Sequence, residues 1–385
     1  MRILHVMETP GQGSGRHVID LVEGMRDRGH ELHVVYSAVR ANPNFRCELE
    51  ALGGTRVRVS EIAMYRRPGL RDLASLLSLY RYIRKHGPFD VVHGHSSKAG
   101  ALARLAASST GGLRFYTPNA LVTLDPMLGA WERRFYSAVE LWLSRISDGI
   151  IAVSPEEHAA ALALGIEERR VFLILSGVKA PVGQARAVAR ERLSLSENLV
   201  CAGFVGRLTR QKAPERLMAA FAEAASRRPN LRLLIVGDGD LMAMVQEMAM
   251  RLRVEHKVIW TGEVDSSEVF TALDIFVLPS RFEGLSYSTM EAMGFGIPVV
   301  TTDTGGARVL VEDGVTGFIV VQNHETQIIA DLAAALASLT DDATMRRAMA
   351  TAAMAKSHEF RASRMVEEVL ELYGRLRRSQ TAGLP

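Results

Sequence analysis

Residues 275–294 read Ile-Phe-Val-Leu-Pro-Ser-Arg-Phe-Glu-Gly-Leu-Ser-Tyr-Ser-Thr-Met-Glu-Ala-Met-Gly, and this stretch is the most informative in the chain. The apolar run that ends at Leu278 predicts a buried strand, which the following proline ends. Ser288 precedes Glu291 by three residues, as in a capping box, and this spacing predicts the start of a helix. Glu283 and Glu291 then flank a strand-to-helix turn that suits a hydroxyl-rich ligand, although a capping role would explain either acid taken alone.

The same alternation of short strands and longer helices continues along the whole chain. Short β-branched runs alternate with amphipathic stretches, which is typical of an α/β protein with parallel sheets. One set of predicted strands ends near residue 153, and a second set lies between residues 200 and 320. A chain of 385 residues is too long for a single core. We therefore expect two doubly wound, Rossmann-like domains that face each other across a cleft.

The linker between these domains is predicted at residues 176–183, where the sequence is rich in Gly, Ser and Pro. The first domain is expected over residues 1–182 and the second over residues 183–361. A last helix over residues 362–378 is expected to cross back to the first domain. The tail, residues 379–385, is expected to be disordered.

Composition and charge exclude several classes of protein. An apolar content of 48% with 23% charged residues is ordinary for a soluble globular protein. The net charge of +3 comes from the first half, which suits an anionic partner or surface there but not nucleic acid. Cys47 and Cys201 lack metal-ligand spacing and favour a reducing compartment. No apolar run approaches the roughly 18–20 residues that span a bilayer, so we expect a cytoplasmic protein.

A basic loop follows the first strand of the second domain. Gly206 allows close approach of a ligand to the backbone, and Arg207 and Lys212 bring two cations to the loop. The next helix has Pro214 near its first turn, and its N-terminus adds a positive dipole end. This combination suits a diphosphate, although a solvated basic loop explains it equally well.

Two further glycine clusters follow strands. The first predicted strand is followed by Gly13, Gly15, Arg16 and His17. The spacing of the glycines differs from the dinucleotide fingerprint, and no acidic residue ends the second predicted strand. A nicotinamide cofactor is therefore not expected, whereas an anion or an acceptor would suit this loop. Gly305-Gly306 would turn backbone N–H groups toward a ligand, or would simply form a turn.

Asp238-Gly239-Asp240 has the form of a metal-binding Asp-x-Asp motif, but it stands between a predicted strand and a predicted helix. Acidic residues at that place commonly cap a helix or form a turn. We therefore expect no metal site.

Taken in order along the chain, these motifs resemble the retaining glycosyltransferases of the GT-B fold, family four (glycosyl transferases group 1). The resemblance covers nearly the whole chain. It rests on residues 15–18, 93–100, 151–154, 206–212, 236–239, the pair Glu283 and Glu291, and residues 305–306.

The resemblance implies transfer of a sugar from a nucleotide-diphosphate sugar, most often a UDP-sugar, to a saccharide or lipid-linked acceptor. It implies that Arg207 and Lys212 neutralise the diphosphate, that Glu283 contacts the sugar, and that Glu291 contacts the ribose. It also implies retention through same-face attack, no cofactor and no metal, and a role in bacterial cell-surface or exopolysaccharide assembly. The remaining residues expected at the donor are Gly206, Gly262, Leu278, Ser280, Gly284, Leu285, Gly305 and Gly306.

The first domain departs from the family pattern at one place. Asn119 stands where many relatives carry the His of Thr-x-His-Gly, and an amide cannot become a cation. Together with Asn119, the residues expected on the acceptor side or in the cleft are Gly13, Gly15, Arg16 and His17. His93, at a strand end, is expected to be buried, neutral and hydrogen-bonded.

Two stretches, residues 80–85 and 131–142, mix aromatic and basic side chains at helical spacing. Interfacial helices have this composition, so an anionic membrane surface is one expected partner, with the protein at the inner face of the cytoplasmic membrane. Core packing with arginines that reach solvent explains both stretches equally well.

Two other functions fit the same motifs. A sugar-nucleotide epimerase or hydrolase of the same fold would act without an acceptor, and a non-catalytic protein could close on a ligand. The presence of both acids together with Arg207 and Lys212 argues against a non-catalytic protein.

Overall fold

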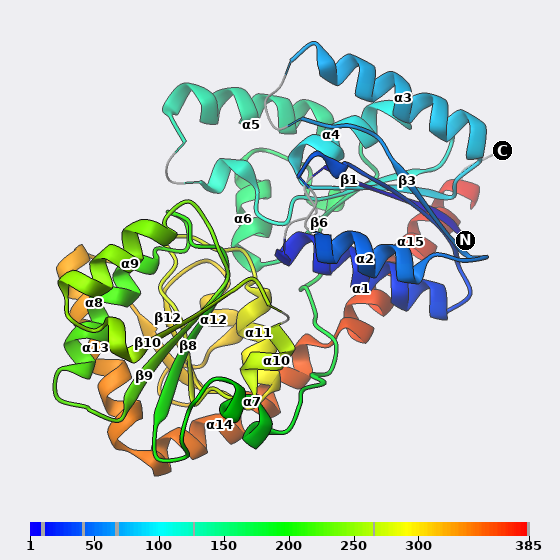
Figure 1. The fold of residues 1–385 in the computed structure, drawn as a ribbon. Helices are drawn as coiled ribbons and strands as arrows, with labels where there is room; N and C mark the ends of the chain where they lie inside the picture. Colours follow the sequence, from blue (N-terminus) through cyan, green and yellow to red (C-terminus); the bar gives the residue numbers. More distant parts are fainter. Residues whose placement is uncertain (9–11, 41–42, 66–68, 126–127, 265, 383–385) are drawn as a thin grey trace. The chain divides into compact units, whose positions relative to one another are not determined.

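The computed structural model describes residues 1–8, 12–40, 43–65, 69–125, 128–264 and 266–382. The chain forms two compact units (Figure 1). Unit 1 comprises Met1–Lys179 and Arg361–Pro385, and unit 2 comprises Ala180–Phe360. The junction after Lys179 lies inside the predicted linker.

Unit 1 is built on a parallel sheet with the strand order β3-β2-β1-β4-β5-β6-β7. The order reverses direction between β1 and β4, which makes this the topological switch point of the sheet. The strands are β1 (Arg2–Met7), β2 (Glu31–Tyr36), β3 (Val57–Glu61), β4 (Val91–His95), β5 (Leu113–Thr117), β6 (Gly149–Ala152) and β7 (Val171–Leu173).

Helices cover both faces of this sheet because the strands are apolar on both sides. Ile3 and Met7 of β1 pack in the core that α1 and α15 contribute to, while Leu4 and Val6 pack with α3 and α4. Figure 1 shows these two groups of helices on opposite sides of the sheet. The helices of unit 1 are α1 (Gln12–Asp27), α2 (Pro43–Leu52), α3 (Arg71–His86), α4 (Ser97–Ala106), α5 (Ala130–Ser144), α6 (Pro155–Ala163) and α15 (Ala362–Ala382).

The last helix, α15, belongs to unit 1 although it follows unit 2 in sequence. Its residues Val366 and Val369 are buried in the same core as α1, and the Tyr373 hydroxyl lies 2.5 Å from His93 Nδ1. The helix continues to Ala382, and Ser379 Oγ donates to the Arg375 carbonyl at 3.2 Å. The expectation that the helix ends at residue 378 was therefore wrong, because the polar residues that follow continue the helix. Residues 383–385 lie outside the described residues.

Unit 2 has a second parallel sheet, with the order β10-β9-β8-β11-β12-β13 and its switch point between β8 and β11. Helix α8 packs against α13 and α9, and α11 packs against α14. The strands are β8 (Val200–Val205), β9 (Leu231–Val236), β10 (Val258–Gly262), β11 (Ile275–Leu278), β12 (Val299–Thr302) and β13 (Gly317–Val320). The helices are α7 (Arg186–Arg192), α8 (Pro214–Ala225), α9 (Met242–Arg251), α10 (Ser266–Phe270), α11 (Tyr287–Gly294), α12 (Ala307–Leu310), α13 (Glu325–Asp341) and α14 (Ala343–Ser357). The predicted α/β class with two parallel sheets is confirmed.

Candidate functional site

The loops that follow β8 and β11 meet at the switch point of unit 2. Lys212, in the loop after β8, places its Nζ 2.7 Å from Oε1 of Glu283, in the loop after β11. The two side chains are only 18% and 10% exposed, so water screens this ion pair less than a surface pair. The crevice at the carboxyl ends of parallel strands, where their order reverses, is the usual ligand site of such sheets. The structure thus brings together two residues that the sequence analysis selected separately.

Buried hydroxyl groups hold Glu283 in place. Ser280 is completely buried, and its Oγ donates to Glu283 Oε1 at 2.7 Å. Thr302, at the end of β12, donates from Oγ1 to the Ser280 carbonyl at 2.5 Å. Glu283 is therefore oriented by the ends of both β11 and β12.

Helix α8 and the loop before it support the same turn. Arg216 donates to both carboxylate oxygens of Glu325, at 2.8 and 2.7 Å, and to the Pro279 carbonyl at 3.3 Å. The Arg281 N–H donates to the Gln211 carbonyl at 2.8 Å, which ties the β11 loop to the β8 loop. These bonds fix the relative position of Lys212 and Glu283.

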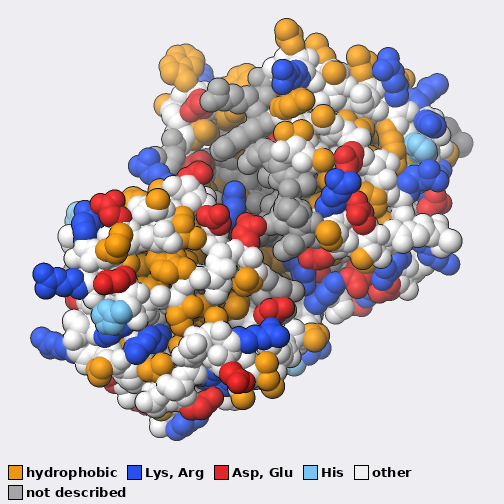
Figure 2. Space-filling model, viewed as in Figure 1, with side chains coloured by type: hydrophobic (Ala, Val, Ile, Leu, Met, Phe, Trp, Pro, Cys, Tyr) orange, Lys and Arg blue, Asp and Glu red, His pale blue; other side chains and the backbone are white. Residues whose placement is uncertain are grey.

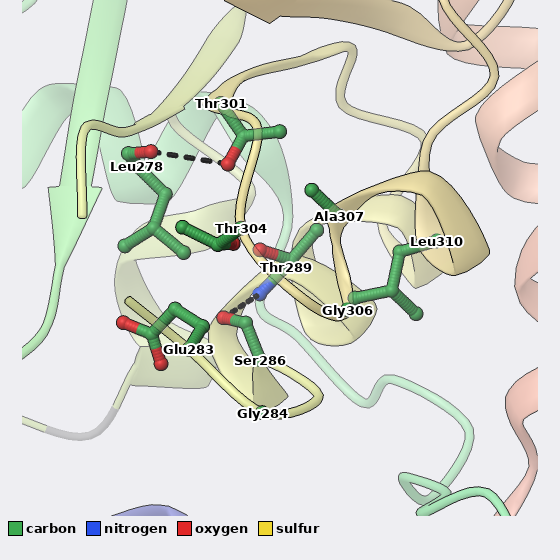
Figure 3. Close-up of a pocket in the computed structure, with 10 residues that line it drawn as sticks. All are labelled: Leu278, Glu283, Gly284, Ser286, Thr289, Thr301, Thr304, Gly306, Ala307 and Leu310. Carbon is green, nitrogen blue, oxygen red and sulfur yellow. Dashed lines mark hydrogen bonds between the residues drawn. The ribbon is translucent and has the colours of Figure 1, made fainter. Parts of the chain in front are cut away.

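Glu283 lines a hollow of about 200 Å³, a volume that includes space open to solvent (Figure 3). Hydroxyl groups dominate its polar lining, and Thr289 Oγ1 is buried without a hydrogen-bond partner among the described residues. The other lining residues are Leu278, Gly284, Ser286, Thr301, Thr304, Gly306, Ala307 and Leu310.

Gly306 allows two backbone segments of the hollow to touch. A Cβ at this position would lie 2.0 Å from the Gly284 carbonyl oxygen and 3.0 Å from Leu285 Cα. Only glycine allows this approach, which sets the α12 start against the Glu283 loop. Gly305 precedes it in the same turn.

Helix α11 begins two residues earlier than the capping-box spacing predicted. Ser286 is the N-cap residue, and its Oγ accepts from the Thr289 N–H at 3.3 Å. Ser288 lies inside the first turn, so the predicted capping box of Ser288 with Glu291 was wrong: of two nearby serines, the earlier one caps the helix. Glu291 remains on this helix, half-buried, but outside the set that lines the hollow.

Gly206 of the basic loop, Gly237 and the predicted donor residue Gly262 lie at the ends of three neighbouring strands. The Gly206 N–H donates to the Val236 carbonyl at 3.0 Å, and the Gly237 N–H donates to the Gly262 carbonyl at 2.8 Å. Gly237 has a φ of +123°, and a Cβ there would lie 2.1 Å from the Gly206 carbonyl oxygen. Arg207 follows with an exposed side chain. The structure therefore places Gly206 and Gly262 beside the basic loop, with Arg207 open to solvent.

The predicted glycine loop of unit 1 is helical in the structure. Helix α1 begins at Gln12, so Gly13 and Gly15 lie in its first turn and not in a loop, while residues 10–11 of the motif lie outside the described residues. Arg16 pairs with Glu48 at 3.2 Å. His17 is 2% exposed, and its Nδ1 lies 3.3 Å from Ser176 Oγ. The structure thus buries His17 in the interior of unit 1.

His17 belongs to a cluster of buried histidines that the sequence analysis missed. His5 Nδ1 lies 3.0 Å from His95 Nε2, and His93 contacts Tyr373 and Thr117 Oγ1. Burial lowers the pKa of His5 to about 3 and that of His17 to about 4, and holds the pKa of His93 and His95 well below the ordinary value. The lowered pKa values favour the neutral form of all four, and the structure confirms that His93 is buried and hydrogen-bonded. The register that pairs His5 with His93 forms the cluster, and local sequence contains no signal for it.

Two groups of side chains have donor atoms that could ligate a metal ion. His5, His93 and His95 place donor atoms within 4.8 Å of one another, but both ring nitrogens of His93 already have partners. Asp238 lies in the loop between β9 and α9, where its Oδ1 accepts from the Gly239 N–H at 2.6 Å. Leu241, and not an aspartate, is the N-cap residue of α9, so the Asp-x-Asp segment lies in the loop before the helix and does not cap it.

Asn119 lies in the turn that follows β5, with a φ of +55°, and Ala120 follows with a φ of +101°. The Asn119 Nδ2 is buried without a hydrogen-bond partner among the described residues. The Ala120 N–H donates to Glu157 Oε1 at 2.9 Å. Glu157 was not selected in the sequence analysis.

The aromatic and basic stretches of unit 1 divide between core and surface. Ile83 is 2% exposed and lies in the core, and Tyr82 packs against that core, whereas other large apolar side chains are exposed. On α5, Trp131, Phe135 and Trp142 share one face and are 85%, 61% and 54% exposed. Large apolar side chains are also exposed on α3, at Leu73, Leu77 and Tyr80, and at its N-cap residue Leu70. Figure 2 shows hydrophobic and basic side chains interspersed along the edge where Figure 1 places these helices. In the described part of the chain, no helix has the length and apolar character needed to cross a membrane.

Comparisons with known proteins cover both units. The family model "Glycosyltransferase Family 4" matches residues 11–180, and "Glycosyl transferases group 1" matches residues 186–356. One relative is the Escherichia coli UDP-Gal:alpha-D-GlcNAc-diphosphoundecaprenol alpha-1,3-galactosyltransferase, with 27% identity over 79% of this chain and 80% of its own. Another is the D-inositol 3-phosphate glycosyltransferase of Actinosynnema mirum, with 28% identity over 96% of this chain and 95% of its own.

Solved structures show the same fold. The crystal structure of Anabaena HepE in complex with UDP and glucose has a TM-score of 0.83 and 22% identity, and the match covers 97% of this chain and 99% of that one. WaaG, a glycosyltransferase involved in lipopolysaccharide biosynthesis, has a TM-score of 0.76 and 18% identity over 97% and 99% of the two chains. The predicted GT-B class is thereby confirmed. With family models matched in both units, the chain belongs to the group 1 glycosyltransferases, with a family 4 N-terminal unit.

Proposed function

We propose that this glycosyltransferase moves a sugar from a UDP-sugar to a saccharide or lipid-linked acceptor, and that unit 2 binds the donor. The observation that carries the proposal is the Lys212–Glu283 pair, 2.7 Å apart at the switch point and beside a hydroxyl-lined hollow. A cation supported by two loops suits a diphosphate, and an oriented carboxylate suits sugar hydroxyls.

The charges of the site match those that develop in the reaction. Departure of a nucleoside diphosphate concentrates negative charge on the leaving oxygen, and fixed cations in a partly buried site stabilise it. Lys212 is the fixed cation, held by Glu283, and exposed Arg207 adds a second positive charge from the same loop. In this proposal Glu283 contacts the transferred sugar, while Glu291 of α11 contacts the ribose.

The nature of the donor and acceptor is inferred from the E. coli relative, whose name specifies UDP-Gal and a diphosphoundecaprenol-linked acceptor. A second relative, the putative glycosyltransferase EpsD of Bacillus subtilis, is 27% identical over 77% of this chain. We accordingly place the activity in bacterial cell-surface or exopolysaccharide assembly.

Retention of the anomeric configuration by same-face attack, without a metal ion, completes the proposal. A double displacement would require a carboxylate nucleophile on the opposite face of the sugar. Mass spectrometry of the enzyme quenched during turnover should detect no glycosyl adduct on Asp or Glu, and transfer should persist after treatment with EDTA. A trapped adduct would contradict same-face attack, and a loss of activity that Mg²⁺ or Mn²⁺ restores would contradict metal independence.

The test of the function is a transfer assay with a panel of UDP-sugars and with undecaprenyl-diphosphate saccharides as acceptors. Lys212→Ala and Glu283→Gln should abolish transfer while circular dichroism and thermal unfolding remain close to wild type. Lys356→Ala and Glu255→Gln are matched controls outside the hollow, and they should retain full activity. Normal transfer by either site variant would contradict the assignment. Turnover of the donor without any acceptor would instead favour an epimerase or a hydrolase.

We also propose that α3 and α5 contact an anionic membrane surface at the inner face of the cytoplasmic membrane. Exposed apolar side chains alternate there with basic ones, including Arg84 and Lys85 on α3 and Arg134 on α5. Such faces bind lipid by apolar burial together with attraction to anionic headgroups.

The membrane proposal is tested by co-sedimentation with vesicles of phosphatidylglycerol or phosphatidylcholine. Wild type should bind the anionic vesicles, and Trp131→Ser combined with Arg84→Glu should reduce binding. Met250→Ser, which removes an exposed apolar side chain of unit 2, is the control and should bind like wild type. Unchanged binding of the double variant would refute the surface.

A further inference from the structure

The turn after β5 has a backbone conformation that its side chains do not favour. Asn119 has a φ of +55° and Ala120 has a φ of +101°. Positive φ is uncommon for residues other than glycine, and alanine gains no compensating local hydrogen bond as Asn does. Such a turn persists only when the surrounding structure imposes it.

Glu157 imposes the turn from the first part of helix α6. Its Oε1 accepts from the Ala120 N–H at 2.9 Å, and its Oε2 accepts from the Val153 N–H at 2.8 Å. The helix is fixed in turn by Ser154, whose Oγ accepts from the Glu157 N–H at 3.1 Å. One carboxylate thus joins the turn after β5 to the end of β6.

The position of Glu157 is costly for a carboxylate. The residue is 1% exposed, and among the described residues the partners of its carboxylate are backbone N–H groups and not a cation. Burial raises the pKa of Glu157 to about 7, against the opposing effect of the N–H groups of Val153, Ala120 and Leu121. A hydrophobic residue would fill the interior at lower cost, but it could not accept these N–H groups.

The same turn contains a side-chain amide that lacks a hydrogen-bond partner among the described residues. The Asn119 Nδ2 is buried without a hydrogen-bond partner in the described part of the chain, although a buried amide donor is normally paired. The neighbouring Thr117 Oγ1 is occupied by His93 Nε2 at 2.8 Å. A donor held this way suits a hydroxyl or carboxylate oxygen of a bound sugar.

We propose that Glu157 is a positioning residue for glycosyl transfer: it holds the Asn119–Ala120 turn so that the Asn119 amide meets a substrate oxygen. The inference rests on the proposed function, and it adds a residue that never touches the substrate. The side-chain amide would act only through the geometry that Glu157 maintains.

The test compares Glu157→Gln, Ala120→Gly and the double variant in the transfer assay. The introduced side-chain amide would place its NH₂ group against a backbone N–H, so the turn should relax and kcat/KM should fall about 10- to 100-fold. Glycine adopts positive φ without strain. The double variant Glu157→Gln with Ala120→Gly should therefore have a kcat/KM at least about tenfold higher than that of Glu157→Gln alone. Ala120→Gly should not rescue Asn119→Ala, since that variant lacks the amide itself.

Glu156→Gln removes the neighbouring exposed carboxylate and serves as the control, with wild-type activity expected. A Glu157→Gln variant that is folded and has wild-type kcat/KM would overturn the proposal, as would a loss of kcat/KM that Ala120→Gly does not relieve.

Hydrogen exchange of the peptide that spans the turn, measured by mass spectrometry, tests the positioning role without substrate. Exchange at Ala120 should accelerate in Glu157→Gln, and unchanged exchange would overturn the positioning role even if wild type transferred no sugar. Absence of transfer by wild type with every UDP-sugar would, by contrast, count against the proposed function.

Discussion

Replacing Gly306 by Ala should separate the two backbone segments that form the hollow of unit 2. The new Cβ would lie 2.0 Å from the Gly284 carbonyl oxygen, whereas close carbon–oxygen contacts in proteins are about 3.3 Å. The segments must therefore move apart by about 1 Å. Since both neighbours are backbone atoms, no change of rotamer can relieve the contact. Glu283 precedes Gly284 directly and would be carried with it.

A displacement of about 1 Å at a catalytic group costs about 100-fold in rate, and overpacking of this kind costs about 1–3 kcal/mol of stability. We therefore expect Gly306→Ala to lower kcat/KM for transfer by about 100-fold, measured by UDP release with the preferred donor. Gly54→Ala is the control, because a Cβ at that exposed glycine would meet no atom within 4 Å. A Gly306→Ala enzyme within twofold of wild type would refute the claim that this contact sets the position of Glu283.

Two further predictions concern stability. Burial lowers the pKa of His17 to about 4, so the folded protein binds this proton less tightly than the unfolded chain, whose pKa is about 6.5. The contribution of neutral His17 to the free energy of unfolding is complete above pH 6.5 and is lost as the pH falls toward 4. Between pH 7 and pH 5, the free energy of unfolding in urea should fall by about 2 kcal/mol more in wild type than in His17→Gln. Parallel pH profiles would contradict this. Arg216→Met removes the donor to the Pro279 carbonyl and to Glu325, and should lower the free energy of unfolding by about 2–3 kcal/mol. A change below about 0.5 kcal/mol would show that Arg216 does not anchor the β11 loop.

The architecture could be predicted from sequence because its signal is local. The runs that became β8 and β11 are apolar on both faces, as buried parallel strands require, and the stretches between them have helical period. The helix after β11 was also predicted, but its N-cap residue was not. Ser286 and Ser288 both carry a hydroxyl group that can cap a helix. Which of them does so depends on how the turn packs.

Contacts between distant segments could not be predicted in the same way. Lys212 and Glu283 meet because β8 and β11 are neighbours in the sheet, and the strand order is a property of the tertiary fold. The histidine cluster arises from the register of β1 with β4 and from the return of α15 to unit 1. The sequence pattern around Glu157 is that of an ordinary acidic residue in the first turn of a helix. Its contact with the Ala120 N–H depends on the position of the turn after β5, which the sequence does not show.

The central claim is that Lys212 in unit 2 binds the diphosphate of the donor. Isothermal titration calorimetry of UDP and of uridine, with wild type and Lys212→Met, tests it most directly. Methionine keeps the approximate length of the side chain and removes its charge. We predict that the Kd for UDP rises at least about tenfold, which corresponds to about 1.4 kcal/mol, while uridine binds both proteins equally. An unchanged Kd for UDP in the folded variant would contradict the claim.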